Sequence, residues 1–255
     1  MSSLPGPDLT TVVRANTPRG EIALRERVIS DGTDGGEQVA HELIVAGVFA
    51  MDSRDTSTEV ALAELCLAEV EAPERVLIGG LGLGFTAWSV LKDRRVRHLD
   101  VVELEEDLIA WARLGLTPTL GMIARHPRAH LHAADIAAVL GGSSPQAGAA
   151  FSPAQPAGAI PPSSAPTGPW DLVLLDVDNG PGFLVHETNA GLYRTEALRS
   201  ALAHVRPGGA LAIWAAQREP DILDRLRSLA RTEEILLPVT REGRDLTYAI
   251  YLTHP

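Results

Sequence analysis

The chain has 255 residues, of which 45% are hydrophobic and 22% charged, a balance that predicts a globular protein with a sizeable core. Its formal net charge of -11 disfavours nucleic acid and anionic membrane surfaces as partners. There is no apolar run of about 18 residues for a membrane span, and the first residues lack the basic and apolar segments of a signal peptide. The single cysteine, Cys66, excludes an internal disulfide and a cysteine-based metal cage. We therefore expect a cytoplasmic protein, and its acidic balance suits a cationic substrate.

Residues 1–55 predict a small N-terminal β region. Alternating apolar and polar residues indicate strands around Thr11–Arg14, Glu21–Val28 and His41–Phe49, with a Gly- and Asp-rich turn at 30–36. A helix is then expected over Ser57–Glu69, because Ser and Thr stand at its start as capping residues.

Residues 56–255 predict a doubly wound α/β domain, because strands and helices alternate. The expected strands are Val76–Ile78, His98–Val102, Ala129–Ala133, Leu172–Leu175, Ala210–Trp214, Thr232–Pro238 and Thr247–Leu252. The expected helices are Thr86–Lys92, Glu106–Arg113, Thr195–His204 and Asp221–Ala230. No helical stretch separates the last two strands, which predicts an antiparallel hairpin at one edge of the sheet. Such an ending is typical of the class I methyltransferase-like, or Rossmann-like, fold.

Between residues 141 and 169 the composition changes to Pro, Ala, Gly and Ser without a single charge. Such a segment has little to bury and predicts a disordered insertion between a helix and the next strand. It is either an inert loop or a gate over the site.

A glycine-rich turn after the first strand of the α/β domain indicates a nucleotide site. Gly79, Gly80, Gly82 and Gly84 leave the backbone without Cβ atoms next to a ligand, and the following helix N-terminus offers free N–H groups. Glu103, about 20 residues further on at the end of the second strand, is placed to accept hydrogen bonds from ribose hydroxyls. A tight turn without any ligand is the alternative.

The spacing of the glycines favours one kind of nucleotide. A dinucleotide fingerprint requires G-x-G-x-x-G, whereas the chain has G-x-G-x-G from Gly80 to Gly84, with Phe85 at the third glycine's place. The loop therefore favours an adenosyl-sulfonium ligand such as S-adenosylmethionine over a pyrophosphate.

A second motif places two carboxylates directly after a buried strand, at Asp176 and Asp178. In open α/β sheets ligands bind at this end of the strands. Neighbouring carboxylates repel each other, so one of them can have a raised pKa and accept a proton. Asp178 could instead form the turn with Asn179.

Together these motifs resemble the spermidine synthase (polyamine aminopropyltransferase) family, in particular its divergent spermidine synthase-like branch from actinobacteria. The resemblance extends over nearly the whole chain and includes the glycine turn, Val101–Leu104, Ala134-Asp135, Asp171–Gly182 and Arg206–Gly209. It implies that Glu103 binds the ribose, Leu104 packs on the adenine and Asp135 accepts from the adenine amino group. It also implies that Asp176 is the catalytic acid that takes a proton from an attacking amine, and that Asp178 holds a cationic acceptor. A homodimer formed through the N-terminal β region would be usual for this family.

The chain also departs from the family pattern. The family has Asp-x-x-Asp after the strand, whereas this chain has Asp176-Val-Asp178. Leu83 stands where the family's loop has an aspartate that contacts the aminopropyl ammonium of the donor, and Glu59 takes the place of a tyrosine. The resemblance therefore carries over the fold and adenosyl binding, but not the donor type or the acceptor.

Further candidates have plainer alternatives. His186 either lines an acceptor pocket or lies in a plain loop, and Trp214 either walls the site or belongs to the core. His126, His130 and His132 raise the question of a metal site, but no acid or cysteine completes the set, so we expect no metal.

The sequence thus predicts a spermidine synthase-like transferase that moves an aminopropyl group from decarboxylated S-adenosylmethionine to a small amine. A methyltransferase that uses intact S-adenosylmethionine is the main alternative, because Leu83 replaces the ammonium-binding acid. A non-catalytic protein that binds an adenosyl ligand is a third possibility, and nicotinamide binding fits the glycine spacing least.

Overall fold

The computed structural model describes residues 9–30, 37–141, 165–177, 187–241 and 243–255. The chain divides into two compact units, Met1–Ser57 and Thr58–Pro255. The boundary predicted from sequence, between residues 55 and 56, lies close to this division. Much of the predicted insertion, residues 142–164, lies outside the described part. No helix in the described ranges is long and apolar enough to cross a membrane.

The first unit is an antiparallel sheet whose four strands follow one another in chain order. They are β1 (Leu9–Thr17), β2 (Gly20–Ser30), β3 (Glu37–Val45) and β4 (Val48–Asp52). The single strand expected over His41–Phe49 is wrong, because the chain reverses direction at Ala46 and Gly47, which have φ of 50° and 77°. Both residues are in the left-handed region that a tight hairpin turn requires, so the apolar run splits into β3 and β4.

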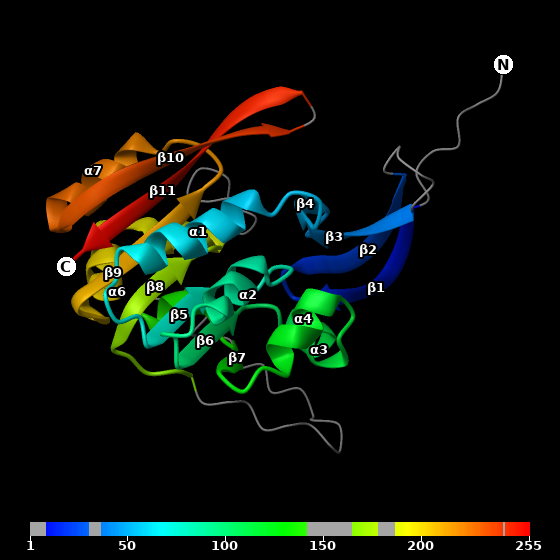
Figure 1. Cartoon of the computed structure of the whole chain (residues 1–255), viewed down its shortest axis with the longest axis horizontal. Coiled ribbons are helices and arrows are strands. Elements are labelled where there is room, and N and C mark those ends of the chain that lie inside the picture. Colours follow the sequence, from blue (N-terminus) through cyan, green and yellow to red (C-terminus); the bar gives the residue numbers. More distant parts are fainter. Residues whose placement is uncertain (1–8, 31–36, 142–164, 178–186, 242) are drawn as a thin grey trace. The chain divides into compact units, whose positions relative to one another are not determined.

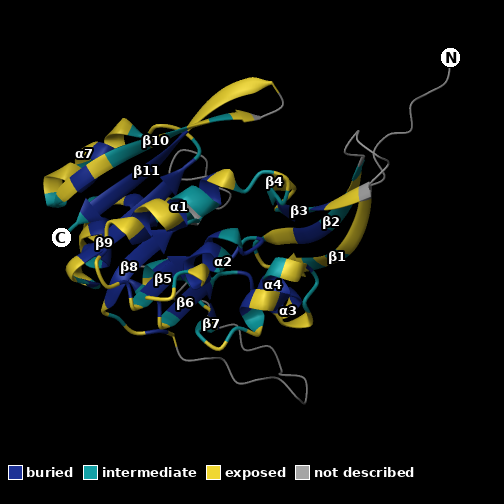
Figure 2. Ribbon diagram, in the orientation of Figure 1, coloured by how far each residue is buried: buried dark blue, intermediate teal, exposed yellow. Residues whose placement is uncertain are grey.

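The second unit is built on a seven-stranded sheet in the order β10-β11-β9-β8-β5-β6-β7. Its strands are β5 (Arg75–Gly79), β6 (His98–Glu103), β7 (Ala129–Ala133), β8 (Trp170–Leu175), β9 (Val205–Ala215), β10 (Arg231–Arg241) and β11 (Arg244–His254). Strands β5 to β9 pair in parallel, and β11 pairs antiparallel with both β9 and β10. The predicted doubly wound sheet with an antiparallel hairpin at its end is therefore confirmed. In Figure 2 the central strands β5 and β8 are buried.

Helices cover both faces of this sheet. They are α1 (Ser57–Ala68), α2 (Phe85–Lys92), α3 (Glu106–Leu114), α4 (Pro118–Ala124), α5 (Ile136–Val139), the 3-10 helix η1 (Glu187–Tyr193), α6 (Thr195–Ala203) and α7 (Pro220–Leu229). Side chains from α5, α6 and α7 join those of β8, β9 and β11 in one core cluster. Right-handed crossovers place α2, α3 and α4 on the opposite face, where α1 also lies in Figure 1.

Sequence analysis missed the short helices α4 and α5 of this unit, as well as the 3-10 helix η1. Helix α4 begins after Thr117, whose hydroxyl accepts from the Leu120 N–H, and Pro118 occupies its first turn. This is a standard start signal in the sequence, but only seven residues follow it. Helix α5 has only four residues, which is too short for a periodic pattern.

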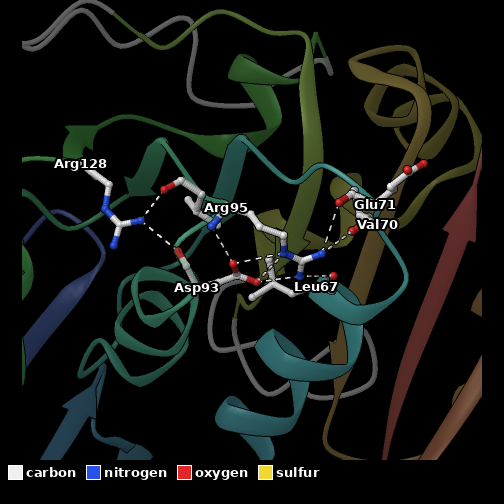
Figure 3. Close-up of polar contacts among 7 residues, drawn as sticks. Leu67, Val70, Glu71, Asp93, Arg95 and Arg128 are labelled. Carbon is white, nitrogen blue, oxygen red and sulfur yellow. Dashed lines mark hydrogen bonds and ion pairs between the residues drawn. The ribbon is translucent and has the colours of Figure 1, made fainter.

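Two arginines attach helix ends to the loop between α2 and β6 (Figure 3). The guanidinium of Arg95 donates to the carbonyls of Leu67 and Val70 at the end of α1, at 2.9 and 3.0 Å, and bonds Asp93 at 2.6 Å. Arg128 donates to the carbonyls of Asp93, Val96 and Leu91. These bonds satisfy carbonyls that a helix C-terminus leaves without partners, so they fix α1 and α2 against the sheet.

A buried carboxylate, that of Asp100 in β6, organises a polar cluster within the sheet. One of its oxygens bonds His132 at 2.8 Å and His98 at 3.1 Å, and the other accepts from the indole N–H of Trp170 at 2.9 Å. Although burial opposes ionisation, these bonds lower the pKa of Asp100 to about 2. Of the three histidines that raised the question of a metal, His132 bonds this aspartate and His130 stacks on the ring of His98. No group of three or more His, Cys, Asp or Glu side chains within the described ranges could hold a metal ion.

We expect Asp100→Ala to lower the free energy of unfolding by about 2–4 kcal/mol at pH 7, because it leaves the buried Trp170 N–H and His132 ring unpaired. The exposed Asp224→Ala in α7 is the control, with an expected change below about 0.5 kcal/mol. Because the pKa of Asp100 is lowered, its contribution is complete above about pH 4 and is lost as the pH falls toward 2. Urea unfolding at pH 7 and pH 3 measures both effects. Equal stabilities of the two variants at pH 7 would contradict this role.

Candidate functional site

Most of the candidate residues lie at the carboxyl ends of neighbouring strands of the α/β sheet. The order of these strands reverses between β5 and β8, since the chain moves outward through β6 and β7 before it returns to β8. Ligands of open α/β sheets bind at such a switch point. The glycine turn follows β5, Glu103 ends β6, Asp135 follows β7 and Asp176 follows β8. The topology therefore brings together residues that are up to about 100 positions apart in the sequence.

Two glycines of the turn are required by contacts within the protein. Gly80 has φ +96°, and a Cβ added to it would lie 2.1 Å from the carbonyl oxygen of Asp176. A Cβ on Gly84, φ +89°, would lie 2.4 Å from the side chain of Ile123. Gly79 is similarly confined by Ile136, and Gly82 has φ +50°. These glycines let the glycine loop pack against β8 and α4, and the expectation that they bring a ligand close stays a prediction.

Hydrogen bonds within the protein engage several N–H groups of the glycine loop. The N–H of Gly80 donates to Val102, that of Gly84 to Leu81, and that of Leu81 to the Glu103 carboxylate at 2.9 Å. A phosphate cradle needs free N–H groups that converge, and it would not place a carboxylate against them. The loop is therefore poorly suited to a pyrophosphate and well suited to a ligand with hydroxyl donors.

Glu103 is held in place by two backbone donors. Its Oε2 accepts from Leu81, and its Oε1 accepts from the Glu105 N–H at 2.8 Å. Burial raises the pKa of Glu103, while these two bonds act in the opposite direction. Each carboxylate oxygen has a second lone pair, so this side chain retains the capacity to accept from two further hydroxyls. Leu104, the residue expected on the adenine, follows it and is partly exposed.

Asp135 has a structural role that the sequence did not show. Its carboxylate accepts from the Ala137 N–H at 2.8 Å and caps helix α5. The neighbouring Ala134 N–H donates to the carbonyl of Glu103, so Asp135 and Glu103 lie at the same edge of the sheet. This location is compatible with the predicted contact to an adenine, and helix capping is a second reason for an aspartate here.

Asp176 combines a fixed position with an altered acidity. Its N–H donates to the carbonyl of Gly79 at 2.9 Å, and its carboxylate accepts from the Thr86 hydroxyl of α2 at 2.6 Å. Burial and, to a smaller extent, the negative charge of Glu59 raise the pKa of Asp176 to about 7, and the Thr86 bond limits the rise. At neutral pH this carboxylate is thus poised to accept or release a proton.

Glu59 reaches this site from the first turn of α1. Its side chain is buried, and its Oε2 accepts from the Thr58 hydroxyl at 2.7 Å. The structure therefore brings two acidic side chains, Glu59 and Asp176, close enough for one to alter the pKa of the other. Sequence analysis missed Thr86 and Thr58, the hydroxyl donors to these acids. Thr86 could have been noticed as a polar residue in the first turn after the glycine loop.

Two further residues of the predicted site, Asp178 and His186, lie outside the described residues. Their expected contacts with an acceptor therefore stay predictions.

Comparison with solved structures identifies the fold. A spermidine synthase in complex with the transition-state analogue AdoDATO superposes with a TM-score of 0.67 at 16% identity, over 96% of this chain and 73% of the other. The spermidine synthase of Thermotoga maritima gives 0.66 at 16% identity, over 96% and 72%. The chain has the fold of the spermidine synthases. The expected methyltransferase-like α/β fold with an N-terminal β region is thereby confirmed.

More distant is human methyltransferase-like protein 13 in complex with SAH, with a TM-score of 0.48 and 18% identity over 77% of this chain and 78% of the other. No family model matches the sequence, and no curated protein is similar to it at the level of sequence. The likeness to spermidine synthases is one of structure, which sequence identity alone would not reveal.

We expect Gly80→Ala to destabilise the protein by at least about 2 kcal/mol, since the added methyl would collide with the Asp176 carbonyl in addition to the strain of a positive φ. Gly208→Ala is the matched control, because Gly208 has φ +80° and nothing within 4 Å of the added Cβ. The control should therefore cost only the backbone strain, about 1 kcal/mol. Thermal and urea unfolding of both variants measure the difference, and equal losses would show that the contact between the glycine loop and Asp176 is not tight.

Proposed function

We propose that this protein is a transferase that moves an alkyl group from an adenosyl-sulfonium donor to an amine, with Asp176 as the base. Aminopropyl transfer from decarboxylated S-adenosylmethionine is the specific reaction. The observation that carries the proposal is the carboxylate of Asp176, which is held by Thr86 at the switch point with a pKa of about 7. The fold shared with spermidine synthases supports it.

The acidity of Asp176 suits the chemistry of an amine acceptor. An alkylammonium ion has a pKa of about 10 and lacks a lone pair, so it must lose a proton before it can attack carbon. The neutral amine then attacks the carbon next to the sulfonium, a C–N bond forms, and the C–S bond breaks with its electron pair going to sulfur. The proton that the ammonium gives up before the attack passes to the ionised Asp176, and the product nitrogen takes over the positive charge of the sulfonium. The carboxylate of Glu59 favours the cationic amine beside it, and positioning supplies most of the acceleration.

The donor would lie along the ends of β5, β6 and β7. Glu103, fixed by the N–H groups of Leu81 and Glu105, would accept from the ribose hydroxyls. Leu104 would contact the adenine, and Asp135 would accept from its amino group. In this arrangement the reactive carbon points toward the end of β8, where Asp176 lies.

One assay tests the reaction and identifies the donor. Purified protein is incubated with a panel of amines and either decarboxylated or intact S-adenosylmethionine. Aminopropyl transfer releases methylthioadenosine, whereas methyl transfer releases S-adenosylhomocysteine. We expect methylthioadenosine, formed only with the decarboxylated donor. Binding of a donor without any product would support a non-catalytic protein, and binding of neither donor would overturn the proposal.

Methyl transfer is the second candidate, and Leu83 is the observation that favours it. This residue stands where the family has an ammonium-binding acid, and its side chain is only 1% exposed. The loop therefore presents no carboxylate at this position to hold the amino group of a decarboxylated donor. Release of S-adenosylhomocysteine in the same assay would establish this alternative.

We expect Asp176→Asn to lower kcat by about 10²–10⁴-fold, the usual contribution of a general base, while the affinity for the adenosyl ligand remains. The affinity should persist because the ribose and adenine contacts are assigned to other strand ends. Asp224→Asn, on the exposed side of α7, is the control and should leave both quantities unchanged. Product assays and calorimetric titration measure the two effects. Full turnover by Asp176→Asn would exclude this residue as the base.

The pH dependence of kcat/KM tests the influence of Glu59. Asp176 accepts a proton only when ionised, so activity should rise as the pH passes through about 7. Removal of the neighbouring negative charge in Glu59→Gln should lower the pKa of Asp176 and move this rise to lower pH. Glu64→Gln, an exposed position on the same helix, should leave the profile unchanged. A rise that stays in place in Glu59→Gln would show that the two carboxylates do not interact.

A further inference from the structure

One buried polar group of the α/β unit, the indole N–H of Trp214, has no hydrogen-bond partner among the described residues. Trp214 is 7% exposed, and its Nε1 forms no hydrogen bond with any of the described residues. A buried donor left unpaired costs about 1–3 kcal/mol, so nearly all such groups in folded proteins are paired. Trp214 is thus an exception that calls for an explanation.

The register of β8 and β9 brings Trp214 and Asp176 to the same end of the sheet. Leu175 and Ile213 are paired across these strands, and both belong to the core cluster packed against α6 and α7. Asp176 and Trp214 are the next residues on their chains, so both side chains point to the opposite face of the sheet. The Thr86 bond confirms this direction for Asp176, since α2 covers that face. Neighbouring strands lie only about 5 Å apart.

One face of the Trp214 ring is already occupied. The ring of Tyr248 stacks on it with centroids 5.4 Å apart and an interplanar angle of 30°. This contact fixes the orientation of the indole. The N–H of the same ring is the group that remains unpaired. Trp214 thus offers a fixed hydrogen-bond donor at the same end of the sheet as the two acids.

We propose that Trp214 selects the acceptor substrate by donating its indole N–H to a neutral oxygen of that molecule. The inference rests on the proposed function, because it assigns the acceptor to the end of β8 and β9. The substrate class is an amine that also carries a hydroxyl or carbonyl oxygen, such as an amino alcohol. The amine end lies at Asp176 and Glu59, and the oxygen lies at Trp214.

Hydrogen bonding to the indole N–H distinguishes amines that carry an oxygen from simple diamines. The second ammonium of a diamine has no lone pair and cannot accept from an N–H. Its charge would also oppose the positive end of the N–H dipole. An oxygen at the same distance accepts the hydrogen bond and removes the penalty of the unpaired donor. The site therefore favours one cationic end and one neutral, oxygen-bearing end.

The test compares two probes of equal length, 4-amino-1-butanol and 1,4-diaminobutane. Dissociation constants are measured by calorimetry on the full chain saturated with methylthioadenosine, and transfer rates are measured with decarboxylated S-adenosylmethionine. The wild-type protein should bind the amino alcohol at least about five-fold more tightly, the value of one net hydrogen bond. Trp214→Phe keeps an aromatic ring and removes the N–H, so the preference should disappear. Trp111→Phe, in α3, removes a buried indole elsewhere in the same unit and should keep the preference.

Each outcome gives a separate answer. Any of three results would overturn the inference: equal affinity for the two probes, a preference for the diamine, or a preference that survives in Trp214→Phe. In each of these cases, transfer to either amine would still uphold the proposed function. Preferential binding of the amino alcohol without transfer upholds the inference and overturns the reaction. If neither probe binds, the inference is overturned. Melting temperatures of both variants show whether Trp214 acts only in the core, since a structural loss would not alter the ratio of the two affinities.

Discussion

The contact on which the rest of the candidate site depends is that between the glycine loop and the end of β8. Gly80 approaches the carbonyl of Asp176 so closely that no Cβ fits between them, and the Asp176 N–H bonds the carbonyl of Gly79. Two segments nearly a hundred residues apart are therefore joined backbone to backbone at the switch point. A side chain at Gly80 would separate the strands, and the proposed donor and acceptor sites would separate with them.

The same contact places a carboxylate where ionisation is unfavourable. Asp176 is partly buried, bonded to one hydroxyl and close to Glu59, so its pKa is raised to about 7. A raised pKa means that the folded state binds the proton more tightly than the unfolded chain does. This residue therefore reduces stability as the pH rises from about 4 to 7, a cost that a purely structural aspartate would not incur. Asp100 is the opposite case, since its bonds to His132, His98 and Trp170 lower its pKa and favour the folded state.

The rest of the α/β unit supports this arrangement from a distance. Arg95 and Arg128 bond carbonyls at the ends of α1 and α2, the helices whose first turns carry Glu59 and Thr86. A helix held at its C-terminus has little freedom to slide, so the side chains of its first turn keep their places. The polar groups of these first turns are thus positioned by bonds at the opposite ends of their helices.

The sequence by itself determined the order of the strands and of the longer helices in the α/β unit, the terminal hairpin and the place of Asp176 directly after a buried strand, because these depend on local periodicity and on acids that follow apolar runs. It did not reveal the turn at Ala46-Gly47 within one apolar run, nor the helices α4 and α5, which are too short for a periodic signal. Only the tertiary structure showed that Glu59 raises the pKa of Asp176, that Thr86 bonds it, and that the Trp214 N–H is unpaired. These properties arise between elements far apart in the chain, where burial and the distance between charges are set by packing.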